Sequence, residues 1–293
     1  MSAITEFASA KINLTLKVGP LGHDGYHPLE SLVVFADVGD RLRIAPAPGL
    51  TLTTAGPFGD ALGAAADNLV LRAARALLAA SGKKAGAHIM LHKALPIASG
   101  IGGGSADAAA TLRGLNRLWG CGLSDIDLEN IGQTLGADVP VCVQSQTRFM
   151  SGRGEVLRDV KNWPILDAVL VNPGFAISTA SVFSRFDEMA LGENLAGVPP
   201  VSAKGVEGAV SQLQGFENSL SAAACALEPR MAALLSTLDA YPQTQLARLC
   251  GSGATCVAIV RTAEDAKDLL KTIKTAYPPY WVEPVKLGLV PRT

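Results

Sequence analysis

The sequence predicts an α+β protein of two domains. The chain has 293 residues, more than the roughly 100–200 typical of one domain. Of these, 48% are apolar, which is enough to build a full hydrophobic core. Strand-like and helix-like segments alternate in both halves of the chain. The change from one half to the other is predicted near 160–164, so that the domains are residues 1–160 and 161–293.

The N-terminal half is predicted to begin with sheet and to continue with helices. Polar and apolar residues alternate over 11–18 and again in LVVFADVGDRLRIAPAP, as they do in half-buried strands. Apolar residues at helical spacing follow in DNLVLRAARALLAASG, where Gly82 is the expected stop. After a strand in AHIMLHKALP, we expect one helix over 105–119 and another that begins at a Ser124 cap.

The C-terminal half is predicted to repeat this alternation. The strand in DAVLVNPG precedes a helix in STASVFSRFDEM, and the Pro- and Gly-rich stretch GENLAGVPPVSAKG is expected to be a surface connector. The last third is predicted to hold one long helix around 225–238, then a strand, TQLARLCGSGATCVAIV, with glycines in its middle. The helix AEDAKDLLKTIKTAY and the strand YWVEPVKLGLV complete the chain.

Charge and hydropathy exclude several classes of function. The net charge is −1 and basic residues are not clustered, so we expect no nucleic-acid partner. The first residues lack the pattern of a signal peptide, and no uncharged apolar span of about 18 residues follows, so we expect no membrane partner. These features predict a soluble, cytoplasmic protein.

The cysteines and histidines do not predict a metal centre. The five cysteines are odd in number, scattered and without CxxC spacing, and we interpret them as small buried hydrophobes. His88 and His92 lie four residues apart, but no acidic or thiol partner accompanies them.

The segment LPIASGIGGGSADAAATLRGLNRLWG is the strongest candidate for an anion site. Its glycines allow a ligand to approach the backbone, and a helix beginning near Ser105 would direct free N–H groups at a phosphate. The lysine of a P-loop is missing, because Gly104 is followed by Ser-Ala-Asp. The dinucleotide fingerprint GxGxxG also fails, since its third glycine falls on Ser105. A structural turn that only packs a helix closely is the alternative interpretation.

Three further features are ambiguous when they are considered singly. The second glycine loop, GSGAT at 251–255, indicates either a bend or a partner of the first loop around one polyphosphate. Asp138 is either the N-cap of a short helix with Pro140 near its start, or a carboxylate available as a base. Lys11 fits an ordinary solvated lysine of an edge strand.

Several of these segments together resemble the GHMP kinase superfamily. SAKINLTL, DGYH, the first glycine loop, LGADVPV and GSGAT occur in the same order and at similar spacing, from about residue 10 to residue 257. Within the superfamily, they are similar to the branch that acts on a cytidine diphosphate sugar alcohol. The resemblance implies an N-terminal domain like ribosomal protein S5 domain 2, a ferredoxin-like C-terminal domain, and an active site between them.

The resemblance also implies a reaction. The γ-phosphoryl group of ATP, bound with Mg²⁺, would be transferred to the 2-hydroxyl of the methylerythritol part of that small-molecule substrate, in the non-mevalonate pathway to isoprenoids. The catalytic pair would be Lys11 and Asp138, with Asp138 accepting or orienting the hydroxyl proton and Lys11 stabilising negative charge.

The remaining site residues follow from the same resemblance. ATP would contact Pro96, Ile97, Ala98, Ser99, Gly100, Ile101, Gly102, Gly103, Gly104, Ser105 and Ala106, with Asn68 and Lys93 near the adenine. The cytidine substrate would contact Asn13, Tyr26, His27, Thr179 and Phe183, and the second glycine loop would contribute Gly251 and Gly253. Ser105 is a candidate ligand of Mg²⁺.

Two departures from the pattern of relatives accompany the resemblance. The first loop continues with Ala106 and Asp107 where Ser-Asn is common, and Asn218 is not followed by the usual acidic residues. Two alternatives stay open: a kinase for another small alcohol, such as homoserine, and a non-catalytic nucleotide-binding protein. Tyr26 and His27 argue against the first, since a short amino acid offers an aromatic ring nothing to stack on.

Overall fold

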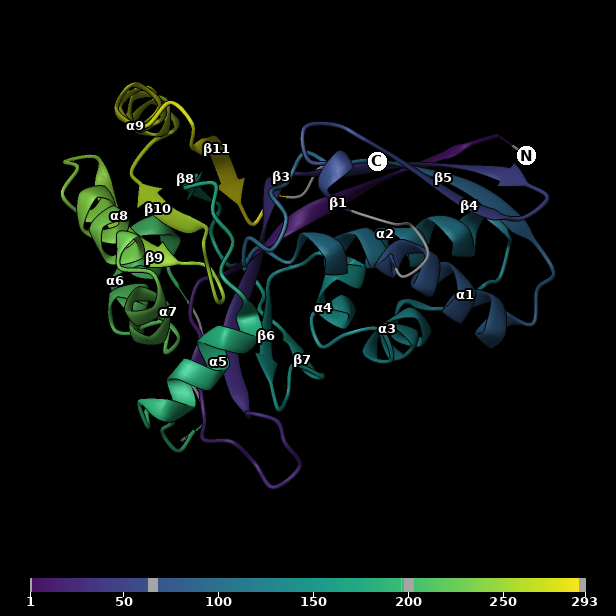
Figure 1. Ribbon diagram of the computed structural model, residues 1–293, viewed down its shortest axis with the longest axis horizontal. Coiled ribbons are helices and arrows are strands. Elements are labelled where there is room, and N and C mark those ends of the chain that lie inside the picture. The colour runs from purple at the N-terminus through teal and green to yellow at the C-terminus, as the bar shows by residue number, and fades with distance from the viewer. Residues whose placement is uncertain (1, 63–67, 196, 198–202, 290–293) are drawn as a thin grey trace.

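The computed structural model describes residues 2–62, 68–195, 197 and 203–289. Figure 1 shows an elongated molecule in which the N-terminal half, purple to teal, lies on one side and the C-terminal half, green to yellow, on the other. The long strand β3 reaches from one half to the other.

The N-terminal half is built on a mixed sheet. Its strands are β1 (Ile4–Asn13), β2 (Lys17–Val18), β3 (Leu29–Ala47), β4 (Leu50–Ala55), β5 (Gly86–His92), β6 (Arg148–Ser151) and β7 (Val156–Asp159). β3 pairs antiparallel with β1, β5 and β6, and β4 is parallel to β5. One 3₁₀ turn, η1 (Asp60–Leu62), and four helices accompany the sheet: α1 (Leu69–Ser81), α2 (Gly103–Leu118), α3 (Asp125–Gln133) and α4 (Val139–Gln144). The helices lie together on one side of β1 and β5 (Figure 1).

The C-terminal half is an antiparallel sheet with helices. Its strands are β8 (Leu166–Asn172), β9 (Thr244–Leu249), β10 (Cys256–Val260) and β11 (Trp281–Leu287). Its helices are α5 (Thr179–Glu188), α6 (Gly205–Gln214), α7 (Ser221–Leu227), α8 (Arg230–Asp239) and α9 (Ala263–Ala276). β11 pairs with β8 along its length and with β3 at Leu287, opposite Ala36. The strands of the two halves therefore form one continuous hydrogen-bonded sheet.

The core consists of three clusters of buried apolar side chains. One lies under the N-terminal sheet and another inside the C-terminal half. The third combines residues of β1 and β3 with residues of β8, β10 and β11, for example Val34 and Leu170. Since each fully buried side chain of this kind contributes about 1.5–3 kcal/mol, the third cluster holds the two halves together.

Local signals in the sequence predict several helix ends. Ser124 caps α3 in a capping box with Asp127, as predicted. Gly82 ends α1 in the left-handed conformation, with φ of 64°. Helix α2 begins two residues earlier than expected, at Gly103, because Gly102 takes the N-cap position with φ of 65°.

Three elements that we predicted to be continuous are each divided into two elements in the structure. The single strand predicted around the second glycine loop is a hairpin of β9 and β10, because Gly251 and Gly253, both with positive φ, turn the chain back. The long helix predicted around 225–238 is two helices, since Pro229 separates α7 from α8. The strand predicted over 11–18 is divided between β1 and β2.

Part of the predicted connector cannot be compared with the structure, because residues 196 and 198–202 lie outside the described residues.

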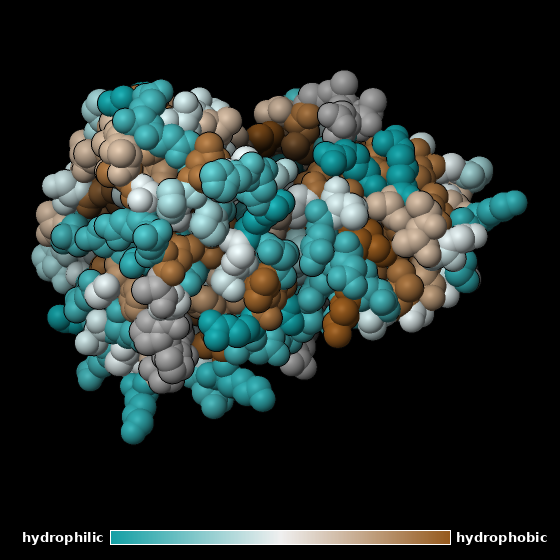
Figure 2. Space-filling model, turned by 90° about the horizontal axis from the view of Figure 1, so that it is seen from below, coloured by the Kyte–Doolittle hydropathy of each residue, from teal (hydrophilic) through white to brown (hydrophobic). Residues whose placement is uncertain are grey.

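Hydrophilic and hydrophobic residues are interspersed over the face seen from below (Figure 2). Within the described part of the chain, no helix has the length and apolar character needed to cross a membrane.

Candidate active site

A pocket of about 980 Å³ brings together most of the predicted site residues. It is lined by β1, the loop before β3, both glycine loops, the start of α4 and helix α5. The four predicted site residues that do not line it are Asn68, Ile101, Ala106 and Gly253. The side chains of Ile101 and Ala106 are buried in the core instead. The lining therefore joins segments that are far apart in the sequence.

Lys11 and Asp138 form an ion pair in this pocket. The Lys11 Nζ atom lies 2.8 Å from Asp138 Oδ1, and the lysine side chain is 5% exposed whereas the aspartate is 40% exposed. Interpreting Lys11 as a solvated edge lysine is therefore wrong. Asp138 does occupy the N-cap position of α4, but its side chain makes no cap hydrogen bond. Its carboxylate faces the pocket and Lys11 rather than the helix.

The first glycine loop places the start of α2 beside this pair. The Lys11 backbone N–H donates to the Ile101 carbonyl oxygen at 2.9 Å, which joins β1 to the loop. A Cβ atom at Gly102 would lie 3.0 Å from Lys11 Cβ, so a side chain there would crowd the lysine. The free N–H groups and positive dipole end of this 16-residue helix adjoin the pocket.

The two glycine loops are in direct contact, as predicted. The Thr255 backbone N–H donates to the Ser99 carbonyl oxygen at 3.0 Å, and a Cβ atom at Gly100 would clash with the Cys250 carbonyl oxygen. Asn218 holds the second loop, because its Nδ2 atom donates to the carbonyl oxygens of Leu249 and Gly251 at 2.9 and 2.7 Å.

Lys93 is buried between two carboxylates. Its Nζ atom lies 2.5 Å from Asp40 Oδ2 and 2.7 Å from Asp107 Oδ2. Burial raises the pKa of Asp107 to about 7, although Lys93 opposes this shift. Burial alone would lower the pKa of Lys93, but the two carboxylates together raise it above its ordinary value. Lys93 thus lines the pocket, but its ammonium group is already paired with two carboxylates of the protein. Asp107 is one of these two partners.

Asn68 has a different position from the one that the resemblance implies. Its Oδ1 atom accepts a hydrogen bond from the Val70 backbone N–H at 2.9 Å and caps α1, while the next residue, Leu69, lines the pocket. The adenine contact of Asn68 stays a prediction.

Aromatic rings also line the pocket. The His27 and Phe183 rings lie 5.0 Å apart, centroid to centroid, and Tyr26 is exposed. The His27 Nδ1 atom lies 2.9 Å from the Gly19 carbonyl oxygen, and Nε2 lies 3.4 Å from Asp187 Oδ1. Both ring nitrogens therefore have protein partners, which we did not expect of a residue predicted to bind the base through them.

Asn13 and Thr179 line the pocket through polar side chains. The Asn13 Nδ2 atom donates to Ser31 Oγ at 2.7 Å, while its Oδ1 atom is buried and has no protein partner among the described residues. The Thr179 and Ser252 hydroxyl oxygens lie 2.9 Å apart and join α5 to the second glycine loop. Asn13 Oδ1 is thus a buried acceptor without a partner in a residue that lines the pocket.

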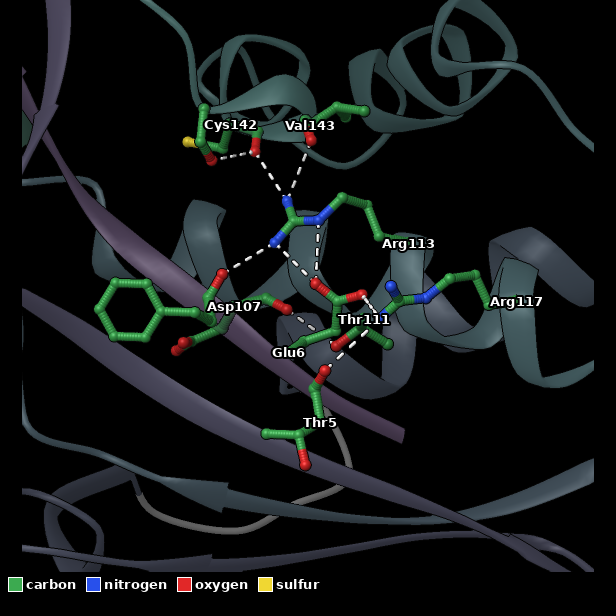
Figure 3. Close-up of polar contacts among 10 residues, drawn as sticks. Thr5, Glu6, Asp107, Thr111, Arg113, Arg117, Cys142 and Val143 are labelled. Atoms are coloured by element: carbon green, nitrogen blue, oxygen red, sulfur yellow. Dashed lines mark hydrogen bonds and ion pairs between the residues drawn. The ribbon is translucent and has the colours of Figure 1, made fainter. Parts of the chain in front are cut away.

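Arg113 connects the elements that carry the pocket residues. It extends from α2 and donates to the carbonyl oxygens of Cys142 and Val143 at the end of α4, both at 3.0 Å. It also donates to Glu6 of β1 (Figure 3). Arg117 binds the same carboxylate from the next turn of α2. These contacts link α2, α4 and β1, which carry the first glycine loop, Asp138 and Lys11.

We expect Arg113→Gln to lower the free energy of unfolding by about 2 kcal/mol, because the Val143 carbonyl oxygen and the buried Glu6 carboxylate each lose a hydrogen-bond donor. The matched control is Arg117→Gln, which we expect to cost less than about 1 kcal/mol, since Arg117 is half-exposed. Urea denaturation measures both values. Equal losses in the two variants would contradict this account of Arg113.

The cysteines, His88 and His92 lie outside the pocket lining. All five cysteines are free; three are buried and two, Cys121 and Cys225, are partly exposed. His88 contacts Thr51 Oγ1 at 2.9 Å. Within the described residues, no group of three or more His, Cys, Asp or Glu side chains is placed to hold a metal ion.

Sequence reasoning missed three charged residues of this region: Asp40, Arg153 and Asp187, which lines the pocket from α5. Asp40, which binds Lys93, lies within the long strand β3 and gave no signal. Arg153 lines the pocket from the turn between β6 and β7. Its position between two glycines, in SGRGE, could have indicated a tight turn that presents an arginine.

Comparison with known proteins identifies the family. Residues 68–146 match the family described as GHMP kinases N terminal domain. A 4-diphosphocytidyl-2-C-methyl-D-erythritol kinase from Parvibaculum lavamentivorans is 45% identical over 280 residues, which cover 96% of this chain and 97% of the relative. A solved structure of 4-(cytidine 5'-diphospho)-2C-methyl-D-erythritol kinase has a TM-score of 0.77 at 30% identity, covering 98% of this chain and 100% of its own.

A homoserine kinase from Cytophaga hutchinsonii has a TM-score of 0.70 at 18% identity, covering 99% of this chain and 95% of its own, and shares the fold alone. These findings confirm the predicted α+β fold of the GHMP kinases and the prediction of a kinase. The chain belongs to the GHMP kinases, in the family of 4-diphosphocytidyl-2-C-methyl-D-erythritol kinases.

Proposed function

We propose that the protein transfers the γ-phosphoryl group of ATP to the 2-hydroxyl of 4-diphosphocytidyl-2-C-methyl-D-erythritol, a step in the formation of isoprenoid precursors. One observation carries the proposal: the ion pair of Lys11 and Asp138 lies in a pocket beside the N-terminus of α2. The names of the relatives support the choice of substrate.

In this proposal, Asp138 accepts the proton of the attacking hydroxyl or orients that hydroxyl. Its carboxylate is half-exposed to the pocket, so a substrate can reach it. Lys11 keeps the carboxylate in position and stabilises the negative charge that develops during transfer. Phosphoryl transfer has a loose transition state, so correct placement and charge stabilisation outweigh the strength of the base.

The first glycine loop binds the triphosphate through its backbone. Most of the loop from Pro96 to Ser105 lines the pocket, and glycines allow phosphate oxygens to approach the N–H groups closely. Mg²⁺ takes oxygen ligands and shares them with phosphates and water, so the Ser105 hydroxyl in the lining is a suitable protein ligand. The ion would neutralise charge on the phosphates when it is bound.

The cytidine end of the substrate lies against Tyr26 and Phe183. Both rings line the pocket, and stacking of a base on an aromatic ring contributes on the order of 1–3 kcal/mol. Because both His27 ring nitrogens have protein partners, we assign His27 chiefly to positioning Phe183. Asn13, two residues after Lys11 in β1, lines the same pocket and is assigned to the reacting end of the substrate.

We further propose that residues 1–160 form the ATP-binding domain and residues 161–293 the second domain. The second domain contributes Thr179, Phe183 and Gly251 to the pocket. Free cysteines are typical of a reducing compartment, which supports a cytoplasmic location.

The proposal is tested by ADP release. We expect the purified protein to release ADP from ATP and Mg²⁺ only when the cytidine diphosphate substrate is present. Homoserine and mevalonate serve as control acceptors. Turnover of either control without turnover of the cytidine substrate would refute the proposal.

Tyr26→Ala is expected to raise KM for the cytidine substrate by about 10-fold, through loss of the stacking contribution. The ring is exposed, so its removal should leave the fold intact. Steady-state kinetics with either substrate varied checks this prediction. KM for ATP should stay within about twofold, and an unchanged KM for the cytidine substrate would remove Tyr26 from the binding site.

A further inference from the structure

Three residues with permanent positive charges line the pocket: Lys11, Lys93 and Arg153. The first two are buried and paired with carboxylates, as described above. Arg153 is paired with Asp24, and these two side chains are 51% and 47% exposed. An exposed ion pair contributes little to stability, so Arg153 can exchange this partner at low cost.

The position of Arg153 is fixed by a tight turn. Gly152 and Gly154, on either side of it, have φ of 72° and 115°, and the Arg153 backbone N–H donates to Glu155 Oε2 at 2.6 Å. The Leu29 N–H donates to the Gly152 carbonyl oxygen at 2.7 Å, which joins the turn to the start of β3. The turn therefore presents the arginine side chain to the pocket from an anchored backbone.

Arg153 lies beside Tyr26, in the same pocket lining as Asp138. Its guanidinium carbon is 4.6 Å from the centroid of the Tyr26 ring. The backbone of its turn approaches α4, because a Cβ atom at Gly154 would lie 3.2 Å from the carbonyl oxygen of Ala137, which directly precedes Asp138. The turn that carries Arg153 thus lies near both the Tyr26 ring and the residue that precedes Asp138.

A cytidine diphosphate sugar alcohol carries its negative charge between its base and its reacting end. Its base is followed by a diphosphate, and the diphosphate is followed by the hydroxyl that reacts. We propose that Arg153 binds the diphosphate of the substrate, releasing Asp24 as it does so, and thereby selects nucleotide-linked acceptors over free alcohols. This inference rests on the proposed function and names the residue that recognises the diphosphate.

The chemistry of the side chains favours this exchange. A guanidinium group forms two parallel hydrogen bonds with phosphate oxygens, and a diphosphate carries more negative charge than one carboxylate. Asp24 competes for the same group: a hydrogen bond from the Tyr26 N–H and the charge of Arg153 hold the pKa of its carboxyl below the ordinary value. Asp24 therefore pairs with Arg153 and holds it beside Tyr26 until the diphosphate of the substrate replaces the aspartate.

The test compares the binding of cytidine and of CDP by isothermal titration calorimetry. In Arg153→Gln, we expect the Kd of CDP to rise at least about 10-fold and the Kd of cytidine to change less than about twofold. Equal weakening of both ligands would mean that Arg153 acts only through the Tyr26 ring, and would overturn the inference. An unchanged Kd of CDP would overturn it as well.

Arg158→Gln is the matched control. Arg158 lies in the adjoining strand β7, its guanidinium carbon is 5.0 Å from the centroid of the Phe149 ring, and it is not in the pocket lining. We expect this variant to bind both ligands as the wild type does. A loss of CDP binding equal to that of Arg153→Gln would show a general charge effect and overturn the inference.

Asp24→Asn tests the exchange of partners. Asparagine can still accept the hydrogen bond from the Tyr26 N–H, now 3.1 Å long, but no longer holds the arginine by charge. We expect CDP to bind several-fold more tightly. Unchanged or weaker binding of CDP would contradict the exchange.

Kinetics separates this inference from the proposed function. In Arg153→Gln, KM for the cytidine substrate should rise by the same factor as the Kd of CDP, while KM for ATP should change less than about twofold. A wild type that binds CDP but has no kinase activity would refute the proposed function alone. A wild type that does not bind CDP would refute the diphosphate site itself.

Discussion

Asp138→Asn is expected to lower kcat by at least about 100-fold, with KM for both substrates nearly unchanged. General base catalysis typically contributes 10² to 10⁴ in rate, and an asparagine of the same shape cannot accept the proton. The substitution also removes the charge that Lys11 faces at 2.8 Å, so the lysine loses its partner at the site of transfer. Single-turnover measurements would locate the loss in the chemical step.

The control for this variant is Asp159→Asn. Asp159 also forms an ion pair, with Arg148 at 2.9 Å, but it lies in β7 outside the pocket lining. The variant should retain kcat within about twofold, because Asp159 is exposed and Arg148 keeps its second ion pair, with Glu129. If Asp138→Asn stays folded and nearly as active as the wild type, Asp138 is not the base.

Much of the local structure can be predicted from the sequence, because its causes lie within a few residues. Ser124 and Asp127 form a capping box three residues apart, and Gly82 ends α1 where the apolar pattern stops. The first glycine loop is recognisable for the same reason. The hairpin of β9 and β10 was missed because apolar residues flank Gly251 and Gly253 on both sides, and the pattern resembles one strand.

The polar contacts of the pocket depend on pairs that are distant in sequence. Lys11 and Asp138 were matched only through the resemblance to a family, since neither residue has a local pattern that indicates the other. Lys93 was predicted to lie near a nucleotide, but the structure adds Asp40, 53 residues before it, and this partner had no signal. Tertiary packing decides which charged side chains become buried together, and spacing along the chain does not reveal this.

We expect Lys93→Met to lower the free energy of unfolding by about 3–5 kcal/mol. Methionine fills the space of the lysine side chain, but Asp40 and Asp107, both buried, lose their only cation among the described residues. Removal of one partner from a buried charged group has a cost of this size. Denaturation in urea measures it, and the midpoint of thermal unfolding should fall by on the order of 10 °C.

Asp107→Asn is the matched variant, and we expect it to cost less than about 1 kcal/mol at neutral pH. Asparagine has the shape of a protonated aspartic acid, and burial raises the pKa of Asp107 to about 7, so the wild-type group is partly protonated there. Its amide oxygen can replace the Oδ2 atom that faces Lys93. The double variant with Lys93→Met should regain part of the stability that Lys93→Met loses, because only one buried carboxylate is then left without its cation.

The dependence of stability on pH distinguishes an effect of the buried charges around Lys93 from a simple loss of packing. The pKa of Asp107 is raised on folding from its ordinary value of 3.8, so between about pH 4 and pH 7 the folded state binds more protons than the unfolded state. By linkage, this group makes the wild type less stable as the pH rises through that interval, and the full penalty is present above pH 7. Asp107→Asn lacks the group, so its stability relative to the wild type should increase from pH 5 to pH 8. If the difference in stability between Asp107→Asn and the wild type does not change with pH, the raised pKa of Asp107 is contradicted. If Lys93→Met loses little stability at every pH, the two carboxylates do not need the lysine.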